Sequence, residues 1–446
     1  MIISYLKVKN AYLCKMKRKI DNLLIEWKNK VDRKPLIVNG ARQVGKTYSL
    51  KAFGKAHFDQ IVYINLEVQS YINQFFDQHV HPREVISFIE ANTSVHITSN
   101  DTLIVFDEIQ SCPRALLSLK SFAEDAPEFY VAAAGSLLGV AINRENISYP
   151  VGKIDEITLY PLDLEEFIWA LGKDGVSEKI KEHFENNMEI NASMHKLCLD
   201  IFKTYQIIGG MPACVAHFAT HNNYSEAQEI HTQIINDYAA DMAKYASGSL
   251  AVKIRACYDS IPVQIAKENK KFQYKIVQKG GTATIFGEAI DWLMYAGVIL
   301  KCDKINHGYI PVLAYRDLSD FKIYMSDIGL MTTKSGYPIQ MILSDVDPEN
   351  TFNGALMENY VAQALTAKGY KLLYWKNENT AECDFVIQNE TEIIPIEVKS
   401  GRRTRSISMS IFSKKYNAPY SILLSSKNFG FENGIKSVPL YAAWCL

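Results

Sequence analysis

The stretch that decides the fold is GARQVGKT at residues 40–47, which fits the pattern G-x-x-x-x-G-K-[ST]. A short apolar segment at residues 36–39 precedes it, and a helical segment begins at Tyr48. Glycines let the backbone curl so that successive N–H groups face one phosphate group. The start of the following helix adds positive charge. A strand, a glycine-rich turn and a helix in this order predict a phosphate-binding loop, which we call the phosphate loop.

Each position of the phosphate loop has an expected role. Lys46 is expected to bridge the β- and γ-phosphates of a nucleotide, and Thr47 is expected to place its hydroxyl on Mg²⁺. The residues that we expect to contact the nucleotide are Gly40, Ala41, Arg42, Gln43, Val44, Gly45, Lys46, Thr47 and Tyr48. No Asn-Lys-x-Asp signature for guanine follows the phosphate loop, which favours ATP over GTP. The expected cofactors are therefore ATP and Mg²⁺.

A second apolar segment, residues 102–106, ends in the two acids Asp107 and Glu108. Open α/β sheets bind their ligands at the carboxyl edge of the strands, which is where these acids are expected to lie. Asp107 is expected to hold Mg²⁺, directly or through water, and Glu108 to act as the catalytic base that polarises the attacking water. Two acids about sixty residues after a phosphate loop strengthen the prediction of a nucleotide hydrolase.

A third segment, residues 130–134, is followed by Gly135 and Ser136. The Ser136 side chain is expected to sense the γ-phosphate, although a simple turn explains the same two residues equally well. Other polar side chains can also approach the nucleotide, and the sequence does not choose among them: Gln110, Arg114, Arg144 and Lys153.

From residue 35 to about residue 164, short apolar segments alternate with helical ones. The expected strands are residues 36–39, 61–66, 102–106, 130–134 and 154–159. This alternation predicts an α/β fold with a parallel sheet and helices on both of its faces. Residues 166–270 are mainly helical, with a break at GGMP (209–212).

The composition excludes several classes of protein. The 446 residues contain 48 Lys and Arg against 49 Asp and Glu, and 48% of the residues are hydrophobic. These values argue against disorder, and no apolar run reaches the ~18 residues of a membrane span. Lys7 and Lys9 interrupt the apolar start, so a secretory signal is not expected. We therefore expect a cytoplasmic protein without membrane contact, and a net charge of −1 leaves room only for a local basic groove.

Residues 271 to about 315 predict a helix followed by a hairpin around Asn306-His307-Gly308. A winged helix has this order, and so does a small α/β packing unit. Both alternatives remain open because the expected recognition helix is hardly basic.

A second set of acids lies near the C-terminus. Alternation along the strand 396–399 puts Glu397 and Lys399 on one face, and a turn at 388–391 would bring Asp384 towards Glu397. Two acids and a lysine suit a Mg²⁺-dependent phosphodiesterase, and Glu358 on the preceding helix can supply a third carboxylate. The alternative is an exposed ion pair on a scaffold strand. Three basic residues follow and can either grip phosphates or form a solvated surface: Arg402, Arg403 and Arg405.

The ordered phrases GARQVGKT, YINLE (63–67), TLIVFDEIQ (102–110), AAGSLLG (133–139) and LYPLDLEEF (159–167) resemble bacterial and archaeal AAA+ ATPases. The phrases GGMP (209–212), YMSDIGL (324–330) and FNGALMENYV (352–361) resemble the C-terminal extension that one group of these ATPases carries. The resemblance implies an AAA+ domain with a helical lid, nucleotide-dependent self-association and a link to DNA.

Asp384, Glu397 and Lys399 resemble the motif of the PD-(D/E)XK restriction-endonuclease-like superfamily. One departure is that Glu382-Cys383, and no proline, precedes Asp384. The resemblance implies a C-terminal α/β domain with a Mg²⁺ site formed by Asp384 and Glu397, with Glu358 as a further ligand.

These patterns divide the sequence into five expected parts. They are an unassigned extension (1–15), an AAA+ ATPase core (16–165), a helical lid and connector (166–270), a winged-helix-like region (271–345) and a restriction-endonuclease-like domain (346–446). Residues 1–15 fit nothing that follows, and we hypothesise that Met16 is the natural initiator.

The sequence as a whole predicts Mg²⁺-dependent ATP binding and hydrolysis, coupled to DNA binding or processing through the C-terminal domain. The alternative is a nucleotide-gated DNA-binding or protein-interaction switch with little turnover and a catalytically inactive nuclease-like fold. The expected partners are ATP, DNA and further copies of this chain.

Overall fold

The computed structural model describes residues 16–136, 150–246, 248–267, 270–344, 351–377, 381–400 and 407–446. The predicted N-terminal extension, Arg144, and the basic run at 402–405 lie outside these residues. The chain divides into two compact units. The first unit holds residues 1–160 with 295–297, and the second holds 161–294 with 298–446. The finer division into five parts stays a prediction.

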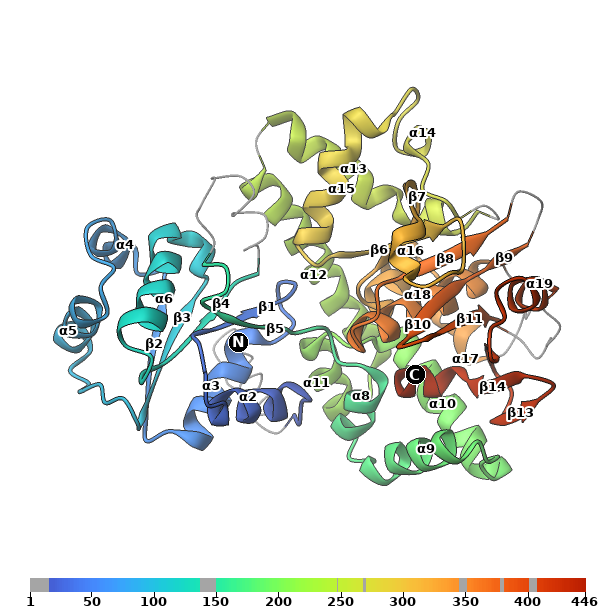
Figure 1. Cartoon of the computed structure of the whole chain (residues 1–446), viewed down its shortest axis with the longest axis horizontal. Coiled ribbons are helices and arrows are strands. Elements are labelled where there is room, and N and C mark those ends of the chain that lie inside the picture. The colour runs from blue at the N-terminus through green and yellow to red at the C-terminus, as the bar shows by residue number, and fades with distance from the viewer. Residues whose placement is uncertain are drawn as a thin grey trace. The chain divides into compact units, whose positions relative to one another are not determined.

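The first unit contains a five-stranded sheet, coloured blue to teal in Figure 1. Its strands are β1 (Leu36–Asn39), β2 (Gln60–Asn65), β3 (Thr102–Asp107), β4 (Tyr130–Ala134) and β5 (Asp155–Thr158). The spatial order is β2-β3-β4-β1-β5, and every neighbouring pair is parallel. The prediction of a parallel α/β sheet is confirmed. Because all strands run the same way, their carboxyl ends meet at one edge.

Helices cover both faces of this sheet. Those with most of their contacts in the first unit are α2 (Ile20–Asn29), α3 (Lys46–His57), α4 (Ser70–Phe76), α5 (Pro82–Thr93) and α6 (Pro113–Asp125). One face packs Ile104 and Phe106 of β3 into a core with α4, α5 and α6. Leu103 and Val105 are also fully buried, on the face where α3 contacts β3. Burial on both faces explains why β3 reads as a continuous apolar run.

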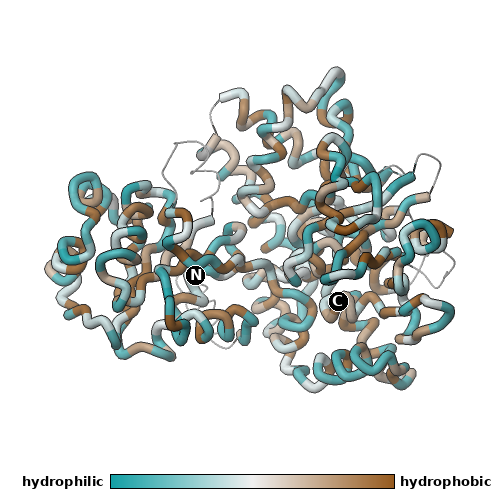
Figure 2. Tube along the Cα trace, in the orientation of Figure 1, coloured by the Kyte–Doolittle hydropathy of each residue, from teal (hydrophilic) through white to brown (hydrophobic). Residues whose placement is uncertain are grey.

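The second unit begins with a helical region. Its helices are α8 (Leu164–Ala170), α9 (Asp174–Asn186), α10 (Ala192–Ile208), α11 (Pro212–His221), α12 (Tyr224–Tyr245), α13 (Gly248–Ile265), α14 (Tyr274–Val277) and α15 (Ala283–Tyr295). Helix α9 is largely hydrophilic (Figure 2). In the part of the chain that the structure describes, no helix combines the length and hydropathy that a membrane span requires.

The predicted helix and hairpin of the middle region are present as α15, β6 (Ile299–Ile305) and β7 (Arg316–Met325). β6 and β7 pair antiparallel, with a register shift after Asp303. The hairpin also carries β8 (Leu373–Lys376), parallel to β6, and β9 (Glu382–Cys383), in the order β7-β6-β8-β9. One sheet therefore crosses the boundary expected at residue 345, and the winged-helix assignment stays a prediction.

A second sheet lies in the C-terminal region, with the order β10-β11-β12-β14-β13. Its strands are β10 (Phe385–Asn389), β11 (Glu392–Val398), β12 (Ser421–Ser425), β13 (Gly430–Glu432) and β14 (Ile435–Pro439). β10 and β11 form the predicted antiparallel hairpin, and β11, β12 and β14 run parallel. The remaining helices are α16 (Ile328–Ser335), α17 (Ile339–Leu343), α18 (Thr351–Ala367) and α19 (Ile407–Tyr416). This region is mixed α/β, as predicted.

A buried carboxylate joins two distant phrases of the sequence within the second unit. Asp327 caps the start of α16 by accepting from the Leu330 N–H at 2.9 Å, and it also accepts from the Gly210 N–H at 2.6 Å. Burial raises the pKa of Asp327 to about 6, against the effect of these N–H groups. GGMP (209–212) and YMSDIGL (324–330) therefore meet in space, and they lock α10 to α16.

The GGMP segment also packs against the backbone of Leu162, which leaves no room for a side chain at Gly210. A Cβ atom there would lie 1.9 Å from the carbonyl oxygen of Leu162, so a Gly210→Ala substitution must shift backbone. We expect the free energy of unfolding to fall by at least ~1–3 kcal/mol, the cost of overpacking a core. Urea unfolding measures this change. The matched control is Gly354→Ala in α18, where a Cβ meets no atom within 4 Å; equal stability of the two variants would contradict the packing argument.

Candidate functional site

The phosphate loop connects β1 to α3 and depends on two glycines. Gly40 has a φ of 138° and Gly45 a φ of 101°, in the region that favours glycine. A Cβ atom on Gly40 would also lie 2.1 Å from the carbonyl oxygen of Leu159. Ala41 and Val44, between them, are buried and anchor the loop in the unit. The backbone therefore takes the curled path that the motif predicts.

Lys46 lies within the curve of this loop. Its Nζ donates to the carbonyl oxygens of Gly40, at 2.8 Å, and Ala41, at 2.7 Å. Burial lowers the pKa of Lys46 to about 8, while the charges of Glu108 and Asp107 oppose that change. A phosphate would offer this ammonium charged acceptors, which form stronger hydrogen bonds than carbonyl oxygens do.

The two predicted Mg²⁺ ligands of the nucleotide site are in contact. The Thr47 hydroxyl donates to Asp107 Oδ2 at 2.8 Å. Asp107 ends β3 and is buried, whereas Thr47 begins α3 beside the loop. A hydroxyl and a carboxylate are hard oxygen ligands of the kind that Mg²⁺ prefers. The donor set at this edge of the sheet therefore fits a nucleotide-bound Mg²⁺.

Tyr63 is a site residue that the sequence reasoning missed. Its hydroxyl donates to Asp107 Oδ2 at 2.6 Å from the neighbouring strand β2. Burial and the hydrogen bond to Asp107 both raise the pKa of Tyr63, so the hydroxyl keeps its proton and donates. The alternation of side chains along the strand was the signal that could have revealed Tyr63. Tyr63 and Asn65 share one face of β2, and Asn65 pairs in register with Asp107 on β3.

Glu108, the expected catalytic base, has a φ of 52°, which turns the chain sharply after β3. Its Oε2 accepts from Gln110 Nε2 at 2.5 Å, so Gln110 holds the carboxylate in place. Two other candidates are engaged elsewhere: Arg114 donates to the carbonyl oxygen of Phe76, and Lys153 forms an ion pair with Glu124. Gln110 is thus the one of these three side chains that reaches a predicted catalytic residue.

Ser136 is buried just beyond β4. β4 lies between β1 and β3, so Ser136 follows the strand that separates the phosphate loop from Asp107. The preceding Gly135 donates its N–H to the Val38 carbonyl oxygen of β1 at 3.3 Å. The position suits a γ-phosphate sensor, which stays a prediction.

The second unit brings Asp384, Glu397 and Lys399 to one end of the β10–β11 hairpin. Phe385 pairs in register with Ile396, and Asp384 Oδ2 accepts from the Val398 N–H at 2.8 Å. Lys399 Nζ lies 2.5 Å from Glu397 Oε1, so these two side chains share one face of the strand, as predicted. The Glu397 side chain is 8% exposed and that of Lys399 is 36% exposed, so the pair is half-buried, and the choice between the two interpretations stays a prediction.

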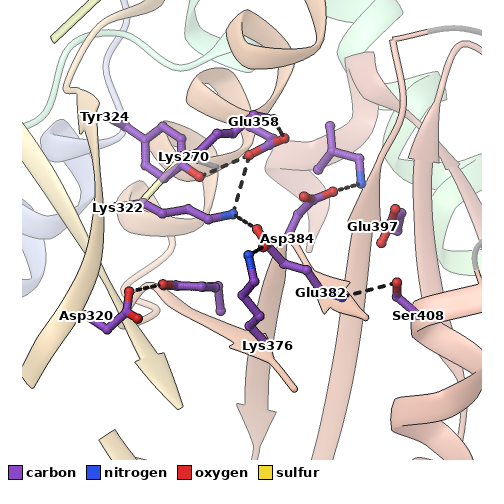
Figure 3. A network of polar contacts seen from close by, with 12 residues as sticks. Lys270, Asp320, Lys322, Tyr324, Glu358, Lys376, Glu382, Asp384, Glu397 and Ser408 are labelled. Atoms are coloured by element: carbon purple, nitrogen blue, oxygen red, sulfur yellow. Dashed lines mark hydrogen bonds and ion pairs between the residues drawn. The ribbon is translucent and has the colours of Figure 1, made fainter. Parts of the chain in front are cut away.

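Glu358, the predicted third carboxylate, forms ion pairs with lysines (Figure 3). It is paired with Lys270 and lies 3.8 Å from Lys322 Nζ, and it accepts a hydrogen bond from the Tyr324 hydroxyl at 3.2 Å. Among the residues that the structure describes, no group of three or more His, Cys, Asp or Glu side chains is arranged to hold a metal ion. Because ammonium groups already lie against both oxygens of Glu358, the predicted Mg²⁺ site at Glu358, Asp384 and Glu397 does not fit these side chains as they are paired here.

One part of the chain matches a family whose type of domain is known. Residues 32–168 match an AAA domain. Together with the phosphate loop and the parallel sheet, this match shows that the region has the fold of an AAA-type P-loop domain. Residues 199–338 and 353–443 each match a domain of unknown function, which leaves the C-terminal nuclease-like assignment without support from these families. No curated protein matches the chain.

Several solved structures are similar to the chain at low identity. A Walker-type ATPase of Pyrococcus abyssi has 13% identity and a TM-score of 0.43, with coverage of 72% of this chain and 95% of its own. The RuvB Holliday junction branch migration motor of Thermotoga maritima has 13% identity and a TM-score of 0.29, with coverage of 63% and 87% respectively. TM-scores this low are too weak to support an inference about the function of this chain.

The contact between Tyr63 and Asp107 gives a test of the Mg²⁺ ligand set. Tyr63→Phe removes the hydrogen bond that orients Asp107 but keeps the ring under the Lys51 ammonium, 3.2 Å from the ring centroid. Loss of such a partner costs ~10–100-fold in metal affinity. We expect the Mg²⁺ concentration for half-maximal ATPase activity to rise ~10-fold, measured by Mg²⁺ titration at saturating ATP. The control is Tyr71→Phe at an exposed position; an unchanged Mg²⁺ dependence in Tyr63→Phe would remove Tyr63 from the site.

Proposed function

We propose that this chain binds ATP with Mg²⁺ and hydrolyses it at the carboxyl edge of the first sheet. The observation that carries the proposal is the contact of Thr47 with Asp107, with Lys46 inside the phosphate loop beside them. A motif match alone predicts each residue separately. Their meeting at one edge, next to an acid that can activate water, supports one hydrolytic site.

The residues divide the chemistry among them. The loop N–H groups and Lys46 bind the β- and γ-phosphates, and they neutralise the charge that develops during phosphoryl transfer. Thr47 and Asp107 hold Mg²⁺, which supplies further charge neutralisation when bound. Glu108, held by Gln110, orients and polarises the attacking water. Ser136 senses whether the γ-phosphate is present.

The site is tested by two substitutions that should fail in different ways. Lys46→Ala should abolish ATP binding, since the loop loses its ammonium. Glu108→Gln should keep ATP binding and slow hydrolysis ~10²–10⁴-fold, the usual contribution of a general base. Binding is followed with a fluorescent ATP analogue and turnover by phosphate release.

The matched control for Lys46→Ala is Lys55→Ala, an exposed lysine on the same helix α3. It should leave binding and turnover unchanged. Wild-type turnover in both Lys46→Ala and Glu108→Gln would refute the assignment of this site.

DNA is the partner that we propose for the second unit, with self-association through the AAA domain as part of the same proposal. Support comes from the sequence: the family resemblance and the basic run Arg402, Arg403 and Arg405 after the β10–β11 hairpin. A run of three arginines provides local positive charge in a chain of net charge −1. Phosphate contacts of this type are independent of base sequence and weaken with salt.

The DNA proposal predicts that duplex DNA stimulates the ATPase at low salt. Replacing the three arginines by alanine should weaken DNA binding and reduce the slope of log affinity against log salt by ~0.9 for each phosphate that the protein no longer neutralises. Fluorescence anisotropy over a salt series measures this slope. Replacing Lys414 and Lys415, in the last turn of α19, is the control for loss of positive charge. Equal binding and equal stimulation in wild type and the arginine variant would exclude these three arginines as the DNA contact.

A second candidate is a nucleotide-gated switch with little turnover and a catalytically inactive nuclease-like fold. The observation that favours it is the pairing of Glu358 with two lysines, which occupies a carboxylate that a metal-dependent nuclease needs free. Purified wild-type protein decides between the candidates, because the switch binds ATP but releases negligible phosphate.

A further inference from the structure

The acids of the second unit form one compact group, which we call the acidic group: Glu358 on α18, Glu382 on β9, Asp384 between β9 and β10, and Glu397 on β11 (Figure 3). Glu358 and Glu397 are buried, with relative exposures of 3% and 6%. Such acids are costly to bury unless cations accompany them. Lysine side chains of the same unit supply these cations.

Lys322 is the cation at the centre of the acidic group. Its side chain is 2% exposed and extends from β7. Nζ lies 2.6 Å from Glu382 Oε1 and 3.8 Å from Glu358 Oε2. Two carboxylates at these distances compensate the buried ammonium. Lys322 therefore stays charged.

Further lysines surround the acids from outside. Lys270 pairs with the other oxygen of Glu358, Lys376 lies 2.9 Å from Glu382 Oε2, and Lys399 pairs with Glu397. Of the four lysines that pair with the acidic group, two precede the predicted nuclease-like domain in the sequence. They are Lys270, ahead of α14, and Lys322 on β7. The preceding part of the second unit thus places two ammonium groups against these acids.

An ammonium at this position is incompatible with a divalent metal bound to the same oxygens. Mg²⁺ and Mn²⁺ need close to six oxygen ligands with their lone pairs free. Glu358 and Glu382 already direct oxygens at Lys322, and a second cation within ~4 Å of Nζ would be repelled. Displacing the ammonium would leave it buried and without a counter-ion.

We propose that Lys322 is the resident cation of the acidic group and takes the place that a divalent metal would otherwise hold. Nuclease-like chemistry that depends on metal at this hairpin is thereby blocked. Removing the ammonium should uncover a divalent-cation site formed by Glu358, Glu382 and Asp384. Glu397 adds a second, independent observation: its buried Oε2 has no hydrogen-bond partner within the described ranges, and it can serve as a further ligand.

The test compares Mn²⁺ binding by the full chain without nucleotide, which keeps nucleotide-bound metal out of the measurement. Wild type, Lys322→Met and Lys301→Met are titrated with Mn²⁺, and free Mn²⁺ is followed by electron paramagnetic resonance. Methionine keeps an unbranched apolar side chain at the position and removes the charge. Lys301 lies on the adjacent strand β6 and pairs with Asp303, so it controls for loss of a lysine from the same sheet.

We expect Lys322→Met to bind one more Mn²⁺ than wild type and Lys301→Met, and to lose it again when Asp384→Asn is added. Mn²⁺ should also raise the Tm of Lys322→Met but not of wild type, by linkage between binding and folding. A folded Lys322→Met variant that gains no Mn²⁺ site would overturn the proposal.

Loss of Lys322 leaves several acids uncompensated, so the single variant can fail to fold. Wild type then decides the question on its own. Mn²⁺ binding by wild type that disappears in Asp384→Asn shows that a metal coexists with Lys322 and overturns the proposal. Wild-type binding that is equal with and without Asp384→Asn supports it. Neither result depends on ATP hydrolysis, so the outcome is separate from that of the proposed function.

Discussion

The hydrogen bond between Thr47 and Asp107 forms because the order of the strands brings these two residues together. The two residues are 60 positions apart, and they meet because β3 and β1 point the same way on either side of β4. All parallel strands deliver their last residues to one edge, so a turn after β1 and an acid at the end of β3 converge. A strand order that placed β3 far from β1 would separate the phosphate loop from its acids. The apolar side chains on both faces of β3 suit a strand that is covered by helices on each side.

The second unit also depends on one carboxylate that joins distant segments. This carboxylate, Asp327, is fully buried, so it does not face a ligand. Asp327 accepts hydrogen bonds from N–H groups just after the end of α10 and at the start of α16, and Gly209 and Gly329 allow the two backbones to approach closely. The phrases GGMP and YMSDIGL, which contain these glycines and this aspartate, therefore have a structural cause in packing. A motif that resembles a functional signature can mark a place where two backbones touch.

The sequence predicted where the residues of the first site lie because their signals are local. A phosphate loop is defined by adjacent residues, and an acid after an apolar strand is visible without knowing the neighbours of that strand. Tyr63 was missed because its role depends on pairing between β2 and β3. The sheet that joins β6 to β8 was missed for the same reason, since Asp303 pairs with Leu373 across seventy positions and two expected domains. Lys322 did leave a signal, as a single lysine in the otherwise apolar segment 321–325.

The two acidic sites differ in the partners that fold with them. Asp107 is held by two neutral hydroxyls, from Thr47 and Tyr63, which orient its oxygens without cancelling its charge. Lys46 lies nearby, but a bound triphosphate would compensate that ammonium and leave Asp107 to the metal. Glu358 is held by the ammonium groups of Lys270 and Lys322, which cancel its charge and occupy both of its oxygens. Carboxylates in a row therefore do not define a metal site; the charge of what already touches them decides whether a cation can still bind.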